Sequence, residues 1–217
     1  MPAIFGRGAN LTARLVCLAA AAGLIVSSLA GWLIPYTDWS SGVGFPADQP
    51  VPFSHRHHVA GLGLDCRYCH ATVERSATAG MPPTYTCMTC HSQLWTNATM
   101  LEPVRRSLAD GQPLHWQRVN RLPDYVYFDH SIHIAKGVGC VTCHGRIDRM
   151  PLTEKQASLR MGWCLDCHRD PAPRLRPRAA VFDMTWRPTS DTPSGATLAR
   201  EYRIHTADLT DCSTCHR

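Results

Sequence analysis

The sequence predicts a mainly α-helical fold with much irregular structure and one long apolar helix near the amino end. Residues 15–34 form a run of twenty residues without a charge. The whole chain contains 15 glycines and 16 prolines but only 8% aromatic residues. A Cys-x-x-Cys-His pattern recurs five times after residue 65. A chain of 217 residues with this composition would bury only a small core from its own side chains.

The five Cys-x-x-Cys-His motifs use ten of the eleven cysteines. Two thiols so spaced can each bond one vinyl group of the same porphyrin, and the adjacent histidine then lies under the iron as its proximal axial ligand. With 12 histidines in 217 residues, chance would place histidine after all five pairs with odds of roughly one in two million. We therefore expect five covalently bound haem c groups. The expected haem-binding residues are Cys66, Cys69 and His70; Cys87, Cys90 and His91; Cys140, Cys143 and His144; Cys164, Cys167 and His168; and Cys212, Cys215 and His216.

Zinc knuckles, redox dithiols and disulfides are the alternative readings of the cysteine pairs. These sites need the cysteines but not the histidine that follows each pair. Five porphyrins would also supply the apolar bulk that the side chains lack. The expected architecture is a multihaem cytochrome c fold, in which loops and short helices wrap stacked haems. Because paired thiols are consumed, this domain is expected on the oxidising, extracytoplasmic side of the membrane.

The uncharged run at residues 15–34 is long enough to cross a bilayer as a helix. Arg7 and Arg14 precede it, which predicts that residues 1–14 stay in the cytoplasm. A signal peptide cleaved near residues 28–30 is the alternative, but the run exceeds the apolar core of such a peptide. We expect an uncleaved, single-pass anchor in a bacterial inner membrane, with the haem domain on the periplasmic side.

An internal repeat follows a polar connector at residues 35–52. Each copy reads Phe-x-His-x-x-His followed by two haem motifs. The copies define a first two-haem module at residues 53–98 and a second at 128–170, separated by residues 99–127. Residues 171–217 then form a linker and the segment that carries the fifth haem.

Weaker local signals predict three further helices. Thr99 to Glu102 resembles a capping box and Gly111 suits a helix end, so a helix is expected between them. Residues 153–156 are expected to cap a helix that runs into the motif at Cys164. Residues 196–205 are expected to form a short helix before the last motif.

Two segments are expected to lack regular structure. Residues 112–127 are expected to be extended or irregular. Residues 169–195 carry five prolines and are interpreted as a linker laid over the surface. Arg174, Arg176 and Arg178 fall in this linker, where we expect solvated charges or contacts with a haem propionate or a partner.

The distal axial ligands decide what the haems can do, because a haem with both axial positions filled passes electrons and one with an open position can bind a small molecule. Rings three residues apart can serve two neighbouring irons. We therefore expect His55 with His58, and His130 with His133, to be distal ligands. Seven histidines lie outside the motifs, at positions 55, 57, 58, 115, 130, 133 and 205.

The fifth distal ligand is expected to be His205, with Met150, Met161 and His115 as rivals. A methionine ligand would raise the potential of that haem relative to the others. His57 is expected to be a surface residue or to support a ligand. Because seven histidines leave no obvious open position, and no residues are grouped for acid–base or nucleophilic chemistry, we expect no catalytic residues.

The formal charge of +5 does not indicate nucleic-acid binding. Five haems would bring about ten propionates, which much of the Lys and Arg excess would pair with. Basic and aromatic residues are also not interleaved in the way that a nucleic-acid surface requires.

The paired histidines resemble those of the small c3/c7-type multihaem cytochromes, in which the two histidines of a pair ligate different haems. Over most of the chain the sequence resembles the pentahaem cytochrome c component of alternative complex III. The resemblance includes the Phe-Ser-His-Arg-His-His segment at residues 53–58 and Cys-Met-Thr-Cys-His-Ser-Gln-Leu-Trp at 87–95. It continues through residues 122–128 and Met-Gly-Trp-Cys-Leu-Asp-Cys-His at 161–168.

That resemblance implies an electron-transfer subunit of a quinol:acceptor oxidoreductase in a bacterial respiratory or photosynthetic chain. The implied partners are integral-membrane quinol-binding subunits, an iron–sulfur subunit, one monohaem cytochrome c and a soluble or bound acceptor. Two alternatives remain open. One is a self-sufficient membrane quinol dehydrogenase, like the anchored tetrahaem proteins of nitrate- and nitrite-reductase systems. The other is a multihaem reductase of small oxyanions or nitrogen compounds.

Overall fold

The computed structural model describes residues 6 and 8–216 of the chain. It divides into two compact units, Met1–Gly42 and Val43–Arg217, which are described separately. Arg7, which was expected to help hold the amino end in the cytoplasm, lies outside the described residues.

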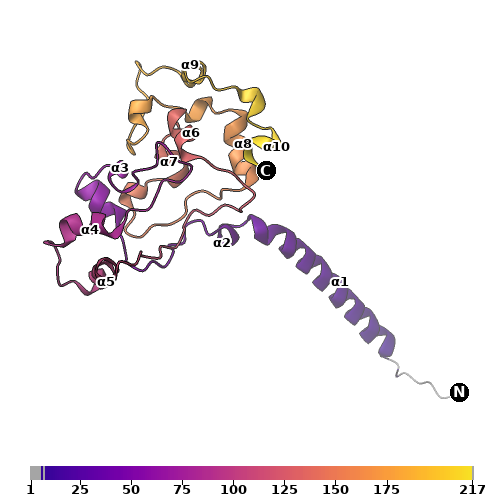
Figure 1. Ribbon diagram of the computed structural model, residues 1–217. Coiled ribbons are helices and arrows are strands. Elements are labelled where there is room, and N and C mark those ends of the chain that lie inside the picture. Colours follow the sequence, from indigo (N-terminus) through magenta and orange to yellow (C-terminus); the bar gives the residue numbers. More distant parts are fainter. Residues whose placement is uncertain (1–5, 7, 217) are drawn as a thin grey trace. The chain divides into compact units, whose positions relative to one another are not determined.

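The first unit is dominated by helix α1, Ala9–Leu33, the long helix drawn in indigo in Figure 1. It begins before residue 15, where the uncharged run starts, because Arg14 does not interrupt a helix. It is long and apolar enough to cross a membrane, and its residues are not buried against other parts of the chain. Such a helix is typical of a signal peptide or of a single membrane anchor.

Short helices occupy the start of the expected connector. They are η1, Ile34–Tyr36, and α2, Asp38–Ser41. Thr37 caps α2, since its Oγ1 accepts a hydrogen bond from the Ser40 amide at 3.4 Å. Gly42 ends α2 in the left-handed conformation, with φ of 74°.

The second unit consists of short helices joined by irregular segments (Figure 1). Residues 112–127 contain no helix, as expected. The fold class predicted from the sequence is therefore confirmed. The α-helices of this unit are α3 (Cys66–Cys69), α4 (Thr84–His91), α5 (Glu102–Asp110), α6 (His130–Ala135), α7 (Cys140–His144), α8 (Met161–Arg169), α9 (Gly195–Glu201) and α10 (Cys212–Cys215). Single-turn helices are η2 (Arg56–Gly61, of the π type), η3 (Thr99–Leu101), η4 (Ile147–Arg149), η5 (Ala172–Arg174), η6 (Arg178–Ala180) and η7 (Thr206–Asp208).

The segment expected to cap a helix at residues 153–156 has a different role. Lys155 and Glu154 form isolated β-bridges with Val43 and Pro46, and α8 begins only at Met161. The capping prediction was wrong because this polar stretch pairs with a segment more than a hundred residues earlier in the chain. Within the described part of the chain, bridges of this kind stand in place of a sheet.

Helix α5 is formed where a helix was expected, but not through a capping box. Thr99 lies in η3, and α5 begins at Glu102 with Pro103 in its first turn, a position that suits proline. The Glu102 carboxylate pairs instead with Arg105 at 3.1 Å. Gly111 ends the helix with φ of 63°, as predicted.

Two small apolar clusters form the core of the second unit. One contains Val51, Leu101 and Val104. The other contains Leu175, Leu198 and Tyr202. Helix α9 contributes Leu198 and matches the helix expected at residues 196–205, although it ends at Glu201. Cores this small are far below what a chain of this length usually buries, as the composition predicted.

The proline-rich segment 169–195 is not a surface linker, in contrast to the prediction. Leu175, Val181 and Met184 are buried, and Val181 has no exposed surface. Arg176 is also buried, with 7% of its surface exposed. The segment follows this path because Leu175 bridges to Val138 and Val181 accepts a hydrogen bond from the Cys140 amide at 3.2 Å. These residues therefore pack against the haem motif that begins at Cys140.

Candidate haem-binding sites

Each Cys-x-x-Cys pair lies on a helix, on α3, α4, α7, α8 or α10. Residues three positions apart on a helix lie on the same face, so both thiols of a pair are presented together. Capping residues fix two of the surrounding turns. Asp65 accepts a hydrogen bond from the Arg67 amide at the start of α3, and Asp129 accepts from the Ser131 amide at the start of α6.

Nine histidines have their Nδ1 atom within hydrogen-bond distance of a partner. Seven of the Nδ1 atoms face a backbone carbonyl, and because a carbonyl only accepts, the proton lies on Nδ1 and the lone pair on Nε2. This is the tautomer that binds a metal, and a second hydrogen bond of this kind orients metal-ligating histidines. The seven are His58, His70, His91, His130, His133, His168 and His216, at distances from 2.6 to 3.3 Å.

The remaining two rings contact side chains. His55 Nδ1 lies 3.0 Å from Oγ1 of Thr153, and His144 Nδ1 lies 3.2 Å from Nδ2 of Asn120, a donor, so Nδ1 of His144 accepts in this arrangement. Thr153 and Asn120 were not singled out from the sequence, because each lies far from its histidine along the chain and belongs to no motif.

Three ring pairs join a histidine of a Phe-x-His-x-x-His segment to the histidine of a haem motif. Bonds of about 2 Å from one metal ion to the Nε2 atoms of two opposed rings would place the ring centroids about 6 Å apart. The observed separations fit an iron ion held between the two rings. The pairs are His58 with His91 at 6.1 Å, His130 with His144 at 6.4 Å, and His133 with His168 at 6.2 Å.

The internal repeat indicates a fourth pair, His55 and His70, because His130 occupies the place of His55 in the second copy and lies opposite His144, the histidine of the motif that follows it. Burial, followed by the positive charges on His70, His58 and His144, lowers the pKa of His55 to about 4. Burial, followed by His130 and His70, lowers the pKa of His144 to about 4. The rings of His55 and His144 are therefore neutral at pH 7, which is the form that can bind a metal.

A phenylalanine fixes the two rings of each His-x-x-His pair at different angles. Phe53 stacks on His58 with centroids 4.4 Å apart and meets His55 edge to face at 4.9 Å. In the second copy, Phe128 contacts His133 and His130 in the same way, at 4.5 and 4.7 Å. The repeat seen in the sequence is thus also a repeat in side-chain geometry, and in the second copy the two imidazoles lie opposite the histidines of two different motifs.

Comparison with known proteins agrees with this geometry. Residues 126–217, which carry the last three motifs, match the family described as cytochrome c7 and related cytochrome c. This segment is a cytochrome c7-like domain. The motifs at Cys66 and Cys87 lie outside the matched residues but have the same Cys-x-x-Cys-His spacing as the motifs of the c7-like domain, so the chain has the sites for several c-type haems.

A characterised relative covers a different share of the chain. Over 124 residues, the chain is 33% identical to the protein named menaquinone reductase, multihaem cytochrome c subunit, from Nitratidesulfovibrio vulgaris. The matched region covers 56% of this chain and 56% of the relative, so the chain spans about half the length of that protein.

The thiols are held in surroundings unlike those of a redox dithiol. Burial, with the neighbouring Cys66 next, raises the pKa of Cys140 to about 12. Burial, with Cys167 next, raises the pKa of Cys143 to about 11. Reactive cysteines have lowered pKa values, so these thiols are not activated nucleophiles. The eleven cysteines form no disulfide, and in the described part of the chain no three His, Cys, Asp or Glu side chains group as a metal site.

Charge interactions between thiols of different motifs indicate which motifs are neighbours. For four thiols, the next cause after burial that raises the pKa is a thiol of another motif: Cys87 for Cys69, Cys66 for Cys140, Cys167 for Cys143 and Cys215 for Cys164. A hydrogen bond of 2.9 Å between Tyr68 and Thr89 also joins the first two motifs. Together these interactions indicate the order second, first, third, fourth and fifth.

The candidates for the fifth distal ligand are more scattered. His205 and His115 are exposed, as is His57, which agrees with its expected place at the surface. Met161 is exposed on α8, whereas Met150 is buried. His216 itself stacks on Tyr125 with centroids 5.9 Å apart.

Proposed function

We propose that the chain is a pentahaem c-type cytochrome that transfers electrons within a membrane-bound quinone oxidoreductase. The ten cysteines of the five motifs would form the thioethers. The motif histidines would be the proximal ligands. Haem supplies reversible one-electron redox chemistry when it is bound. The residues of this chain would attach each haem, ligate its iron and set its position relative to the next haem.

The observation that carries the proposal is the set of three opposed histidine pairs with centroids 6.1 to 6.4 Å apart. It supports His58, His130 and His133 as distal ligands opposite His91, His144 and His168. The equivalence of His55 to His130 in the internal repeat supports the fourth assignment, His55 opposite His70. For the fifth haem we propose His205, with Met150, Met161 and His115 as rivals.

Filled axial positions favour electron transfer over substrate chemistry, because a bis-histidine iron has no site for a small molecule. We therefore propose that the chain is not catalytic alone. The row of motifs supports a path of electrons from the Cys87 motif to the Cys212 motif, or in reverse. An open-position reductase of small oxyanions is disfavoured by the same pairing.

The membrane context rests on similarity. A quinone-linked complex is favoured by helix α1, by the relative named as a menaquinone reductase subunit, and by the resemblance to the pentahaem cytochrome of alternative complex III. We propose a single-pass anchor in a bacterial inner membrane, with residues 43–217 on the periplasmic side. The proposed partners are quinol-binding membrane subunits, an iron–sulfur subunit, one monohaem cytochrome c and a soluble or bound acceptor, and the proposed direction is quinol oxidation.

Quinol-driven haem reduction tests the role within a complex. The haem-loaded chain in mild detergent is mixed with a menaquinol analogue, and haem reduction is followed optically. We expect negligible reduction by the isolated chain and rapid, inhibitor-sensitive reduction when native membrane partners are present. Rapid inhibitor-sensitive reduction by the chain alone would instead establish a self-sufficient quinol dehydrogenase. This is the second candidate function because helix α1 could anchor such an enzyme in the membrane.

A further inference from the structure

Arg176 is a buried cation that lies against the residue preceding the haem motif at Cys140. Only 7% of its surface is exposed. Its backbone amide donates to the Gly137 carbonyl at 2.9 Å. Its guanidinium fills the space beside Gly139, where any Cβ would collide with it. Because Gly139 immediately precedes Cys140, the guanidinium lies against the start of α7.

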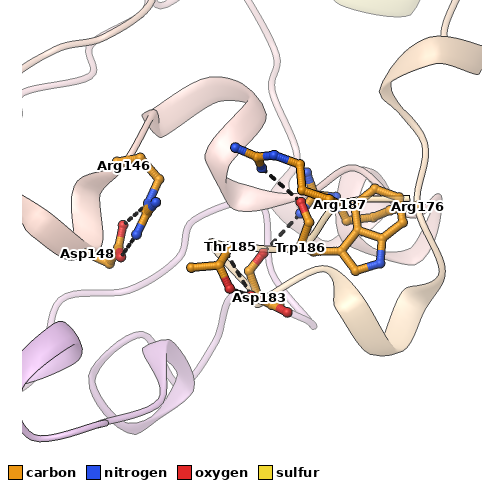
Figure 2. A network of polar contacts seen from close by, with 7 residues as sticks. All are labelled: Arg146, Asp148, Arg176, Asp183, Thr185, Trp186 and Arg187. Atoms are coloured by element: carbon orange, nitrogen blue, oxygen red, sulfur yellow. Dashed lines mark hydrogen bonds and ion pairs between the residues drawn. The ribbon is translucent and has the colours of Figure 1, made fainter. Parts of the chain in front are cut away.

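The contacts of the guanidinium hold it without neutralising it. Its Nη1 donates to the Asp183 carbonyl at 3.0 Å, and the group lies over the Trp186 ring at 4.9 Å (Figure 2). The Asp183 carboxylate is turned to Thr185, whose amide and hydroxyl donate to it at 2.8 and 2.7 Å. Nε of Arg176 is buried without a hydrogen-bond partner. Among the residues that the structure describes, no carboxylate forms an ion pair with Arg176.

Asp148, a second buried charged residue, is neutralised by an ion pair, in contrast to Arg176. Asp148 is 6% exposed, and Arg146 donates to its two oxygens at 2.8 and 2.6 Å (Figure 2). Asp148 is therefore one half of a paired unit, whereas Arg176 keeps an unpaired positive charge. Burial lowers the pKa of Arg176, with Cys140 and then Asp183 opposing the change, yet a guanidinium stays charged in proteins.

The internal repeat supplies a comparison within the same chain. Cys66 occupies in the first module the place that Cys140 occupies in the second. The residue before Cys66 is Asp65, whose carboxylate pairs with Arg67 at 2.8 Å. Both partners are about half exposed, so solvent screens a pair that is already neutral. The two equivalent sites thus differ by one buried, poorly screened positive charge.

We propose that Arg176 raises the reduction potential of the haem at Cys140 and Cys143 above that of the equivalent haem at Cys66 and Cys69. A ferric haem carries one more positive charge than a ferrous haem. A fixed cation in low-dielectric surroundings therefore disfavours the oxidised form. The inference rests on the proposed function, because it requires both motifs to hold haem.

The test is a potentiometric titration of the haem-loaded protein in which NMR resolves and assigns each haem. In the unmodified protein, the Cys140 haem is expected to have a higher midpoint potential than the Cys66 haem. In Arg176→Gln we expect the equilibrium constant for reducing the Cys140 haem to fall about tenfold, which is about 59 mV for a one-electron couple. Arg176→Lys keeps the positive charge, so the midpoint potential of the Cys140 haem should stay close to its value in the unmodified protein.

Arg178→Gln is the matched control. Arg178 lies two residues along the same segment, stacks over Tyr202 at 4.3 Å and donates to the Ala135 carbonyl at 2.7 Å. Its loss should leave every haem potential unchanged. If Arg176→Gln shifts no haem, or if Arg176→Lys shifts the potential equally, the inference is wrong.

If Arg176→Gln does not acquire its haems, the unmodified protein still tests the inference. A midpoint potential of the Cys140 haem equal to or below that of the Cys66 haem would overturn it. Peptide mass spectrometry separates failure of the proposed function from failure of the inference. A Cys140 peptide without haem would overturn the proposed function together with the inference, whereas an unmoved potential on haem-loaded protein overturns the inference alone.

Discussion

The rings of His130 and His144 lie almost parallel, with an interplanar angle of 8° and centroids 6.4 Å apart. The rings of His58 and His91 are equally close, at 6.1 Å, but are inclined at 63°. The two pairs therefore suit the same kind of iron site while presenting the imidazole planes differently.

This difference predicts two classes of low-spin signal. Parallel ligand planes split the two π-type d orbitals of ferric iron, and strongly inclined planes leave them nearly degenerate, which raises the largest g value. Electron paramagnetic resonance of the oxidised protein should show an ordinary rhombic signal from the His130–His144 site and a large-g signal from the His58–His91 site. A spectrum with rhombic signals alone would contradict the ring geometry.

Replacing His58 by Ala should open one axial position. The haem at Cys87 should remain attached, because His58 does not form its thioethers, but it should become high-spin and bind carbon monoxide or added imidazole. His57→Ala is the control, since His57 is exposed and adjacent. Optical and resonance spectra should show one haem in five changed in the first variant and none in the second. Five low-spin haems in His58→Ala would exclude His58 as a ligand.

Asn120 is expected to tune the haem at Cys140 through His144. Its Nδ2 lies 3.2 Å from His144 Nδ1, and a flip of the amide, which exchanges its oxygen and nitrogen, would present the oxygen to an Nδ1 proton. Asn120→Asp would strengthen this hydrogen bond, make the imidazole a stronger donor and lower the midpoint potential of that haem. Asn97→Asp adds the same charge at an exposed position and should change no potential. An unchanged or raised potential in Asn120→Asp would show that this contact does not act on the iron.

Leu198 should hold the carboxyl-terminal segment in place. It is 2% exposed and packs with Leu175 and Tyr202. Leu198→Ala should lower the free energy of unfolding by about 2–4 kcal/mol, whereas Leu152→Ala, at a site 42% exposed, should change it by less than about 0.5 kcal/mol. Chemical denaturation of both variants measures the difference. Equal stabilities would mean that this cluster contributes little to the fold.

The sequence was most informative where the chemistry is local. The haem motifs and the two Phe-x-His-x-x-His segments each lie within six residues, so their spacing alone predicted paired thiols with an adjacent histidine and pairs of rings that serve two neighbouring irons. Helix α9 and the end of α5 at Gly111 were predicted for the same reason.

Features set by distant partners could not be predicted. Residues 153–156 bridge to residues 43–46, so their capping pattern was misleading. The prolines of segment 169–195 indicated a surface path, yet contacts with residues 137–140 bury Arg176. Asn120 and Thr153 reach their histidines across 24 and 98 residues. No periodicity in a single sequence reports such contacts.

The haem content and spin state of the purified chain test the central claim most directly. The chain is produced with a haem c maturation system, and its intact mass, haem-to-polypeptide ratio and ferric resonance spectrum are measured together. Five haems per polypeptide, with at least four of them low-spin, is the result that the opposed histidine pairs predict. Bound zinc or disulfides at the cysteine pairs, or five haems that are mostly high-spin, would contradict the account.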